Sequence, residues 1–252
     1  IVPTVFARII PFLPRPERGA IIPKYPRGIS NELAIQELDT ATVLTKADIV
    51  ILAIKPQQLA AIMPELSATD WTDKCLVSVL AGTPLSSFAA IPTLRNLVRV
   101  MPNTAAKFKQ SISVGCALTS TQQPYLSFID DLFSYVGTYV TIDESQMDTC
   151  TSLCGSGPAF FYELLNTLID FAEQQGFDHQ TARLMVNQLI MGVATTLQQR
   201  NQEPLANLIQ EIRSPNGTTH AGLEKLADTK LLDSWKSVFE AAQQRAKELS
   251  IQ

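Results

Sequence analysis

Short apolar runs alternate with segments of helical spacing up to about residue 142. The runs are rich in Val, Ile and Leu, which is typical of strands buried on both faces of a parallel sheet. Strands are expected at 49–54, 75–82, 97–101, 111–118 and 138–142. Helices are expected between them, near 57–66 and 122–136. This alternation predicts an α/β, Rossmann-like sheet that is doubly wound by right-handed crossovers.

The pattern after residue 143 is helical throughout. Ser145 and Asp148 have the spacing of a capping box in front of a long helix. Gly176 can end that helix, and Asp178 can begin the next one. Shorter helices are expected at about 204–213, 217–228 and 231–249.

The change of pattern predicts two domains. Residues 1–143 should form a Rossmann-like, nucleotide-binding domain, and residues 144–252 an all-α domain. The helices carry more apolar positions than one sheet domain could cover, so we expect a homodimer at least. Examples of these positions are Leu189, Met191, Val193, Leu197, Phe239 and Leu249.

The first 40 residues contain no element that the pattern can place. Prolines at positions 3, 11, 14, 16, 23 and 26 interrupt every candidate helix or strand. Only Gly19 and Gly28 precede position 80, so this segment offers no glycine-rich phosphate loop.

Composition excludes several classes of protein. The net charge of −4 and the isoelectric point near 5.3 give no basic surface for nucleic acid. No apolar run reaches the ~20 residues of a membrane helix, and no signal peptide is visible. The four cysteines form no Cys-x-x-Cys pair and lie far from both histidines, so no metal site is expected. We expect a reduced, cytoplasmic protein without a nucleic-acid or membrane partner.

Three loops follow predicted buried strands, at 53–57, 79–84 and 98–104. Because ligands of open α/β sheets collect at the carboxyl ends of strands, these loops should line one crevice. Lys55 offers a cation, Gly82 a backbone that can be approached closely, and Asn103 an amide. Alternatively, the lysine is merely solvated, the glycine forms a turn and the asparagine caps a helix.

Five motifs occur in the order AIKPQ, AGT, RVMPNTAA, GSGPAFFYELL and SPNGTTHAGLEKL. This set is similar to the signature of the pyrroline-5-carboxylate reductase family, and the resemblance covers residues 42–250. It implies a nucleotide-binding domain followed by a helical domain that binds substrate and forms dimers, sometimes larger rings. The implied reaction transfers a hydride from NADPH, or possibly NADH, to the C=N bond of 1-pyrroline-5-carboxylate and gives L-proline.

The resemblance also assigns residues to the site. Cofactor-binding residues are expected to be Ala53, Lys55, Pro56, Ala81, Gly82, Met101, Pro102 and Asn103. Residues that bind the imino acid are expected to be Ser214, Asn216, Gly217, Thr218 and Thr219. Thr219 is the expected catalytic residue, because its hydroxyl would hold the ring nitrogen, while the backbone of Gly217 and Thr218 would donate to the carboxylate.

The segment from Ser214 to Thr219 also has a physical reading of its own. A tight turn that opens a helix leaves backbone N–H groups free and favours an anion. The family usually has Gly-Gly where this chain has Asn216-Gly217, and asparagine tolerates the left-handed backbone best after glycine. Helix capping is the alternative role of the threonines. His220 is a possible proton donor, but it points about 100° away from Thr219 on a helix.

Gly155, Ser156, Gly157 and Pro158 stand inside the expected long helix. Glycine and proline there should cost stability, which suggests a kink where another backbone approaches closely. The alternative is a loop between two helices.

Two other functions stay open. One is a catalytically impaired nucleotide-binding dimer, which the missing phosphate loop would explain; the other is a related two-domain hydroxy-acid dehydrogenase. Three explanations for the missing phosphate loop remain. The loop lies upstream of residue 1, the sequence of the first segment has been derived wrongly from its gene, or the protein has lost the loop. The first two are favoured because the later motifs are intact.

Overall fold

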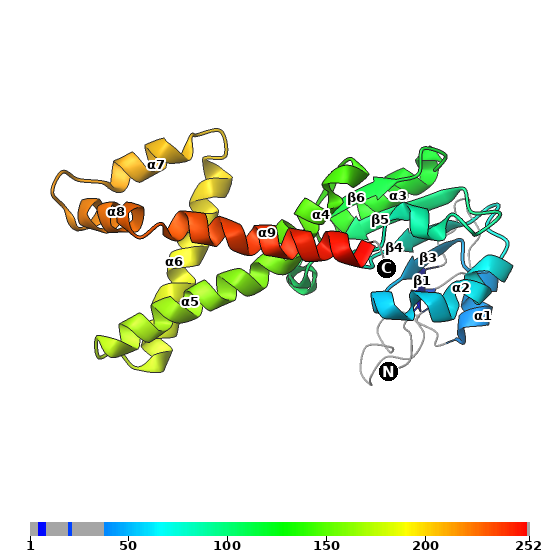
Figure 1. Ribbon diagram of the computed structural model, residues 1–252, viewed down its shortest axis with the longest axis horizontal. Helices are drawn as coiled ribbons and strands as arrows, with labels where there is room; N and C mark the ends of the chain where they lie inside the picture. The colour runs from blue at the N-terminus through cyan, green and yellow to red at the C-terminus, as the bar shows by residue number, and fades with distance from the viewer. Residues whose placement is uncertain (1–4, 9–19, 22–37, 251–252) are drawn as a thin grey trace. The chain divides into compact units, whose positions relative to one another are not determined.

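The computed structural model describes residues 5–8, 20–21 and 38–250 and is drawn in Figure 1. Its contacts fall into two compact units, which are described separately below. The first contains the residues up to Gly155 together with those from Ala241 onward, and the second contains Ser156–Glu240. The division by contacts thus assigns residues 144–155 to the sheet unit, although the sequence pattern changes at 143. Packing explains the difference, because Met147 is fully buried in the core of the sheet unit.

The sheet unit is built on seven strands in the order β2-β1-β3-β4-β5-β6-β7. The strands are β1 (Val5–Arg8), β2 (Ala20–Ile21), β3 (Ile49–Leu52), β4 (Cys75–Ser78), β5 (Asn96–Met101), β6 (Ser111–Ala117) and β7 (Gly137–Thr141). All five predicted strands are present, and the first two end earlier than expected. The expectation that residues 1–40 hold no placeable element is wrong for β1 and β2, while Gly19 and Gly28 lie outside the described residues.

Strand direction divides this sheet into two parts. β3, β4 and β5 are parallel to one another, as predicted. β6 is antiparallel to β5, and β7 is parallel to β6. The pattern of crossovers therefore does not extend to β5 and β6, because the connection 102–110 is too short for a crossover between parallel strands. β1 pairs with β3 in an antiparallel manner.

Helices cover both faces of this sheet, so the unit has three layers. The regular helices are α1 (Thr40–Lys46), α2 (Leu59–Ala68), α3 (Gln123–Ser134) and α4 (Met147–Cys150). Short 3₁₀ turns are η1 (Pro56–Gln58), η2 (Leu85–Phe88), η3 (Thr104–Phe108) and η4 (Glu144–Gln146), and η5 (Thr151–Ser156) is a π-helical turn. One apolar cluster joins α1, α2 and α4 to the sheet, and a second joins α3 to the sheet through Ile129 and Phe133. Alternate residues of β4 enter the two clusters, which explains its continuous apolar sequence.

The second unit is helical, as predicted. It contains α5 (Gly157–Gln174), α6 (His179–Gln199), α7 (Leu205–Ile212), α8 (Thr218–Asp228) and the first half of α9 (Leu231–Ser250). Gly176 ends α5 with a φ of 96°, and Asp178 caps α6 by accepting a hydrogen bond from the N–H of Thr181. In the described part of the chain, no strand follows β7 and no helix is long and apolar enough to cross a membrane.

One expectation for this half is wrong. The capping box uses Asp143 and Gln146 in front of η4, not Ser145 and Asp148. Asp143 occupies the extended residue before the turn, and Ser145 instead donates its N–H to the Asp143 carboxylate at 2.8 Å.

Two of the six apolar positions expected to need a partner subunit are partly covered within the chain. The ring of Phe239 packs edge-on against Phe160 and Trp235, with centroids 5.2 and 5.7 Å away. Leu249 lies against Gly82. The four positions on α6 are exposed.

Candidate functional site

The carboxyl ends of β3, β4 and β5 lie at one edge of the sheet, because these neighbouring strands are parallel. Met101 ends β5, and the loops that follow the three strands carry the other residues predicted to bind a cofactor: Ala53, Lys55, Pro56, Ala81, Gly82, Pro102 and Asn103. The fold therefore brings the three loops to a common edge.

Lys55 presents a cation at this edge. Its side chain is exposed, and its ammonium makes no hydrogen bond or ion pair within the described residues. The backbone is fixed, since its N–H donates to Gln58 Oε1 at 3.2 Å and its carbonyl accepts from the Gln58 N–H at 2.8 Å. A fixed backbone with an uncommitted ammonium suits an anionic or hydroxyl-rich ligand, and it fits simple solvation equally well.

Gly82 is required by the turn after β4. Its φ of 65° is left-handed, and a Cβ at this position would lie 2.6 Å from the Cβ of Leu249. Beside it is a hollow of about 460 Å³. The hollow is lined by Pro56, Gln57, Leu59, Ala60, Met63, Gly82, Thr83, Ser87 and Leu249. The first two loops thus share one cavity, and the C-terminal turn of α9 supplies part of its wall.

The side chain of Asn103 is occupied within the chain. Its Oδ1 accepts from the Ala105 N–H at 3.0 Å, and its Nδ2 donates to the carbonyl of Cys154 at 3.2 Å. The alternative of a helix cap therefore describes this amide better than a ligand contact does. Asn103 ties the loop after β5 to the π-helical turn η5, where the widened backbone leaves carbonyls in need of donors.

The segment Gly155–Pro158 is part of a helix and not a loop between helices. η5 runs directly into α5, so Pro158, which has no N–H, cannot donate to the carbonyl of Cys154 in the preceding turn, and Nδ2 of Asn103 donates to that carbonyl instead. The close approach at Gly155 is made by a side chain and not by a backbone: a Cβ there would collide with Cε of Met101. The predicted cofactor residue Met101 is therefore also a packing partner of η5.

The predicted substrate residues form a turn at the start of α8. The N–H of Gly217 donates to the carbonyl of Ser214 at 3.1 Å, and Asn216 adopts a left-handed φ of 57°, as its residue type permits. A Cβ on Gly217 would collide with the Ser214 hydroxyl. A side chain at 217 would therefore require the Ser214 hydroxyl to move, and the left-handed backbone at 216 suits asparagine.

This turn leaves donors free. The N–H groups of Thr218, Thr219 and His220 have no backbone acceptor among the described residues, as expected in a first helical turn. The N–H of Gly217 is used by the turn itself, which corrects its predicted role as a ligand donor. No side chain caps α8, and the Thr219 hydroxyl makes no hydrogen bond within residues 38–250. The capping alternative for the threonines is therefore wrong.

Both histidines are hydrogen-bonded. His220 Nδ1 accepts from Nε of Arg213 at 2.9 Å, and its Nε2 lies 3.1 Å from Glu224 Oε1. With both nitrogens engaged, His220 is not a free proton donor. His179 is exposed, as expected of a surface residue, and its Nδ1 lies 2.7 Å from Glu173 Oε1. Sequence reasoning did not select Arg213, although it directly precedes the predicted anion turn.

The cysteines and acids of the described chain offer no metal centre or nucleophile. No group of three or more His, Cys, Asp or Glu side chains in the described ranges could hold a metal ion. All four cysteines are free thiols. Burial raises the pKa of Cys75 to about 12 and that of Cys116 to about 11, so neither forms a thiolate readily.

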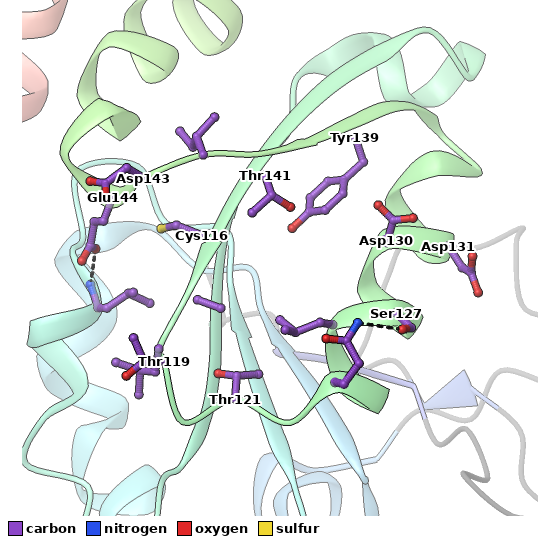
Figure 2. Close-up of a pocket in the computed structure, with 16 residues that line it drawn as sticks. Cys116, Thr119, Thr121, Ser127, Asp130, Asp131, Tyr139, Thr141, Asp143 and Glu144 are labelled. Atoms are coloured by element: carbon purple, nitrogen blue, oxygen red, sulfur yellow. Dashed lines mark hydrogen bonds between the residues drawn. The ribbon is translucent and has the colours of Figure 1, made fainter.

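A second hollow, of about 930 Å³, is shown in Figure 2. It lies where β6 and β7 end, and these strands run against β3–β5, so most of it faces the opposite edge of the sheet. None of the predicted site residues lines it. Its acids also have structural roles, since Glu144 accepts from the Leu85 N–H at 2.7 Å and contacts the buried Arg99 at 3.5 Å. The predicted cofactor residues thus lie at the other edge of the sheet, and the predicted substrate residues lie in the turn before α8.

Comparison with known proteins agrees with the motifs. Residues 144–249 match the family described as pyrroline-5-carboxylate reductase dimerisation, and residues 23–82 match the family described as NADP oxidoreductase, coenzyme F420-dependent. The chain is 32% identical to the pyrroline-5-carboxylate reductase of Pasteurella multocida over 87% of this chain and 80% of that protein.

Solved structures give the same result for the fold. The pyrroline-5-carboxylate reductase of Streptococcus pyogenes is 29% identical and superposes with a TM-score of 0.77 over 87% of this chain and 84% of that chain. The pyrroline carboxylate reductase of Plasmodium falciparum, solved with NADP bound, is 24% identical with a TM-score of 0.77, over 87% and 84% of the two chains. At this level of identity, the similarity to the Plasmodium falciparum structure shows only that the two proteins share a fold.

Proposed function

This chain belongs to the pyrroline-5-carboxylate reductase family, and we propose that it reduces the C=N bond of 1-pyrroline-5-carboxylate to give L-proline. The observation that carries the proposal is the turn before α8, where three N–H groups and the Thr219 hydroxyl have no hydrogen-bond partner among the described residues. A ring that carries a carboxylate beside an imine nitrogen needs an anion site and a hydrogen-bonding partner side by side. The turn offers both.

The chain's groups have separate tasks in this reaction. The N–H groups of Thr218 and Thr219 bind the carboxylate, with Ser214 and Asn216 shaping the turn, and the Thr219 hydroxyl holds the ring nitrogen. That hydrogen bond keeps the substrate oriented while the imine carbon gains a hydride and the nitrogen gains a proton. No nucleophile or metal is needed for these steps.

A nicotinamide nucleotide supplies the hydride when bound. The described edge fits such a group in charge and in space, because Lys55 is uncommitted and a hollow of about 460 Å³ adjoins Gly82. Lys55, Pro56, Ala53, Ala81 and Gly82 would hold it, with Met101 and Pro102 at the neighbouring loop. We propose NADPH as the preferred cofactor, following the family match that names NADP, with NADH as the less favoured one.

We further propose a cytoplasmic homodimer, in which residues 1–143 bind the nucleotide and residues 144–252 bind substrate and form the dimer. The match of residues 144–249 to a dimerisation family supports self-association. Exposed apolar side chains on α6 support it independently. The four free thiols are typical of a reducing compartment.

The direct experiment follows the absorbance of NADPH in the presence of 1-pyrroline-5-carboxylate, with chromatographic detection of proline. We expect oxidation of NADPH that depends on both enzyme and imino acid. Oxidoreductase activity on a hydroxy acid instead would favour the dehydrogenase alternative. No activity with either substrate, from a dimer that binds NADPH, would favour the impaired nucleotide-binding protein.

A further inference from the structure

Arg213 stands beside the turn proposed to bind the substrate carboxylate. It is the residue that ends α7, and the loop that follows it joins α7 to α8 (Figure 1). Its Nε donates to His220 Nδ1 at 2.9 Å, and His220 is the third residue of α8. The guanidinium is therefore fixed next to the same helical turn that carries Thr218 and Thr219.

His220 links this arginine to an acid without neutralising it. An Nδ1 that accepts from Arg213 carries no proton, so the ring proton is assigned to Nε2, which donates to Glu224 Oε1 at 3.1 Å. The imidazole in this arrangement is neutral. Glu224 is engaged by the imidazole, and it forms no ion pair with Arg213.

The rest of the Arg213 guanidinium is uncommitted. A guanidinium has five N–H donors, and in the described chain only the Nε donor of Arg213 has a partner. Arg200 of the same unit differs, since its Nε, Nη1 and Nη2 are all bound by Glu203 and Glu211. Glu211, the only acid of α7, is thus held by Arg200, and Arg213 keeps its positive charge beside the turn.

We infer that Arg213 binds the carboxylate of the imino acid through its two terminal nitrogens, and that His220 and Glu224 are positioning residues for it. This inference rests on the proposed function. The planar fork of a guanidinium matches a carboxylate in a bidentate manner, and fixing Nε leaves that fork free. Arg213 and the N–H groups of Thr218 and Thr219 together select a cyclic imino acid that carries a carboxylate over an imine without one.

Steady-state kinetics of Arg213→Ala test the binding role. The KM for 1-pyrroline-5-carboxylate should rise about 10- to 100-fold, because a charge-assisted contact is lost. The turnover number at saturation should change less than about threefold, since this contact is alike in the ground and transition states. The KM for NADPH should not change. Arg183→Ala, at an exposed position of α6, is the matched control and should behave as the native enzyme.

Variants of His220 test the positioning role. His220→Asn keeps an acceptor near the place of Nδ1 and should retain a KM within about twofold of the native value. His220→Leu removes the acceptor and should raise the KM about 3- to 10-fold. A purely structural histidine would give two variants with similar KM values and lowered thermal midpoints, and that result would overturn the inference.

Calorimetry gives a readout apart from turnover. With oxidised cofactor present, the native protein should bind L-proline more tightly than L-prolinamide, which lacks the carboxylate, and Arg213→Ala should lose most of that preference. An unchanged preference would refute a carboxylate contact at Arg213. Failure of the native enzyme to reduce 1-pyrroline-5-carboxylate would instead refute the proposed function, so the two failures are distinguishable.

Discussion

At the scale of single residues, the proposed chemistry depends on a hydroxyl that the folded chain leaves unused. The Thr219 side chain stands in the first turn of α8 without a hydrogen-bond partner in residues 38–250, and no side chain caps this helix. A polar group that does nothing for the fold is free to serve a ligand. Lys55 has the same property at the edge of the sheet.

Thr219→Ala should lower the turnover number roughly 10- to 100-fold, because one donor to the reacting nitrogen is lost. Thr219→Ser keeps the hydroxyl and should be much milder. Since Thr219 caps no helix, the thermal midpoint of the alanine variant should stay close to the native one. A variant with full activity and lower stability would contradict the catalytic role.

Lys55→Ala should raise the KM for NADPH roughly 3- to 10-fold and leave the turnover number at saturating cofactor nearly unchanged. A cation beside a ribose or phosphate acts alike in the ground and transition states, so its loss affects binding. Lys46→Ala, at another exposed lysine of the same unit, is the control. A reduced turnover number with an unchanged KM would show that Lys55 has another task.

At the scale of elements, local caps fix where the helices begin. Asp178 starts α6 with Oδ1 accepting from the Thr181 N–H at 3.0 Å and Oδ2 from the Thr181 hydroxyl at 2.7 Å. These hydrogen bonds lower the pKa of the Asp178 carboxyl, and the one from the Thr181 hydroxyl has the larger effect. A charged carboxylate is therefore favoured in the folded state.

Asp178→Ala should lower the thermal midpoint by about 2–4 °C at pH 7. Because the folded-state pKa lies below the unfolded one, the stabilisation is present above the unfolded value and is lost as the pH falls through the folded value. The difference between native and variant midpoints should therefore shrink in acid. Asp178→Asn keeps an acceptor and should retain part of the stability without this pH dependence. A difference that does not vary between pH 7 and pH 3 would disprove the assignment.

At the scale of the whole molecule, the helical unit exposes more large apolar side chains than a monomeric protein usually does. On α6 the side chains of Leu184, Leu189 and Met191 are 67%, 56% and 61% exposed. Neighbouring helices add Phe171, Ile212 and Leu232. Many exposed apolar side chains of this kind are typical of an interface with another protein, and the dimerisation family match indicates a second copy.

Sedimentation at micromolar concentration should show a dimer or a larger assembly. Leu189→Glu places a charge in the apolar face of α6 and should shift the equilibrium towards monomer. Gln110→Glu adds the same charge at an exposed position of the sheet unit and is the control. A native protein that stays monomeric at this concentration would refute the homodimer.

The sequence by itself determined the elements and the common edge of the three loops. Apolar runs and helical periodicity are local properties, and they located every strand from β3 to β7, the helices α2 and α3 and the long helices of the second unit, but not α1. Residue type was also sufficient to predict three local features: the left-handed turn at Asn216, the helix end at Gly176 and the N-cap at Asp178. Each of them depends on only a few neighbouring atoms.

Only the tertiary structure decided the direction of β1, β6 and β7 and the partners of polar groups. β6 turns back because its short connection cannot cross the sheet. The Asn103 amide meets the Cys154 carbonyl 51 residues away, and Met101 packs against Gly155. Arg213, His220 and Glu224 join through the turn between two helices. Such partners depend on where the folded backbone places atoms that are separated along the chain. A local pattern of residue types does not predict that placement.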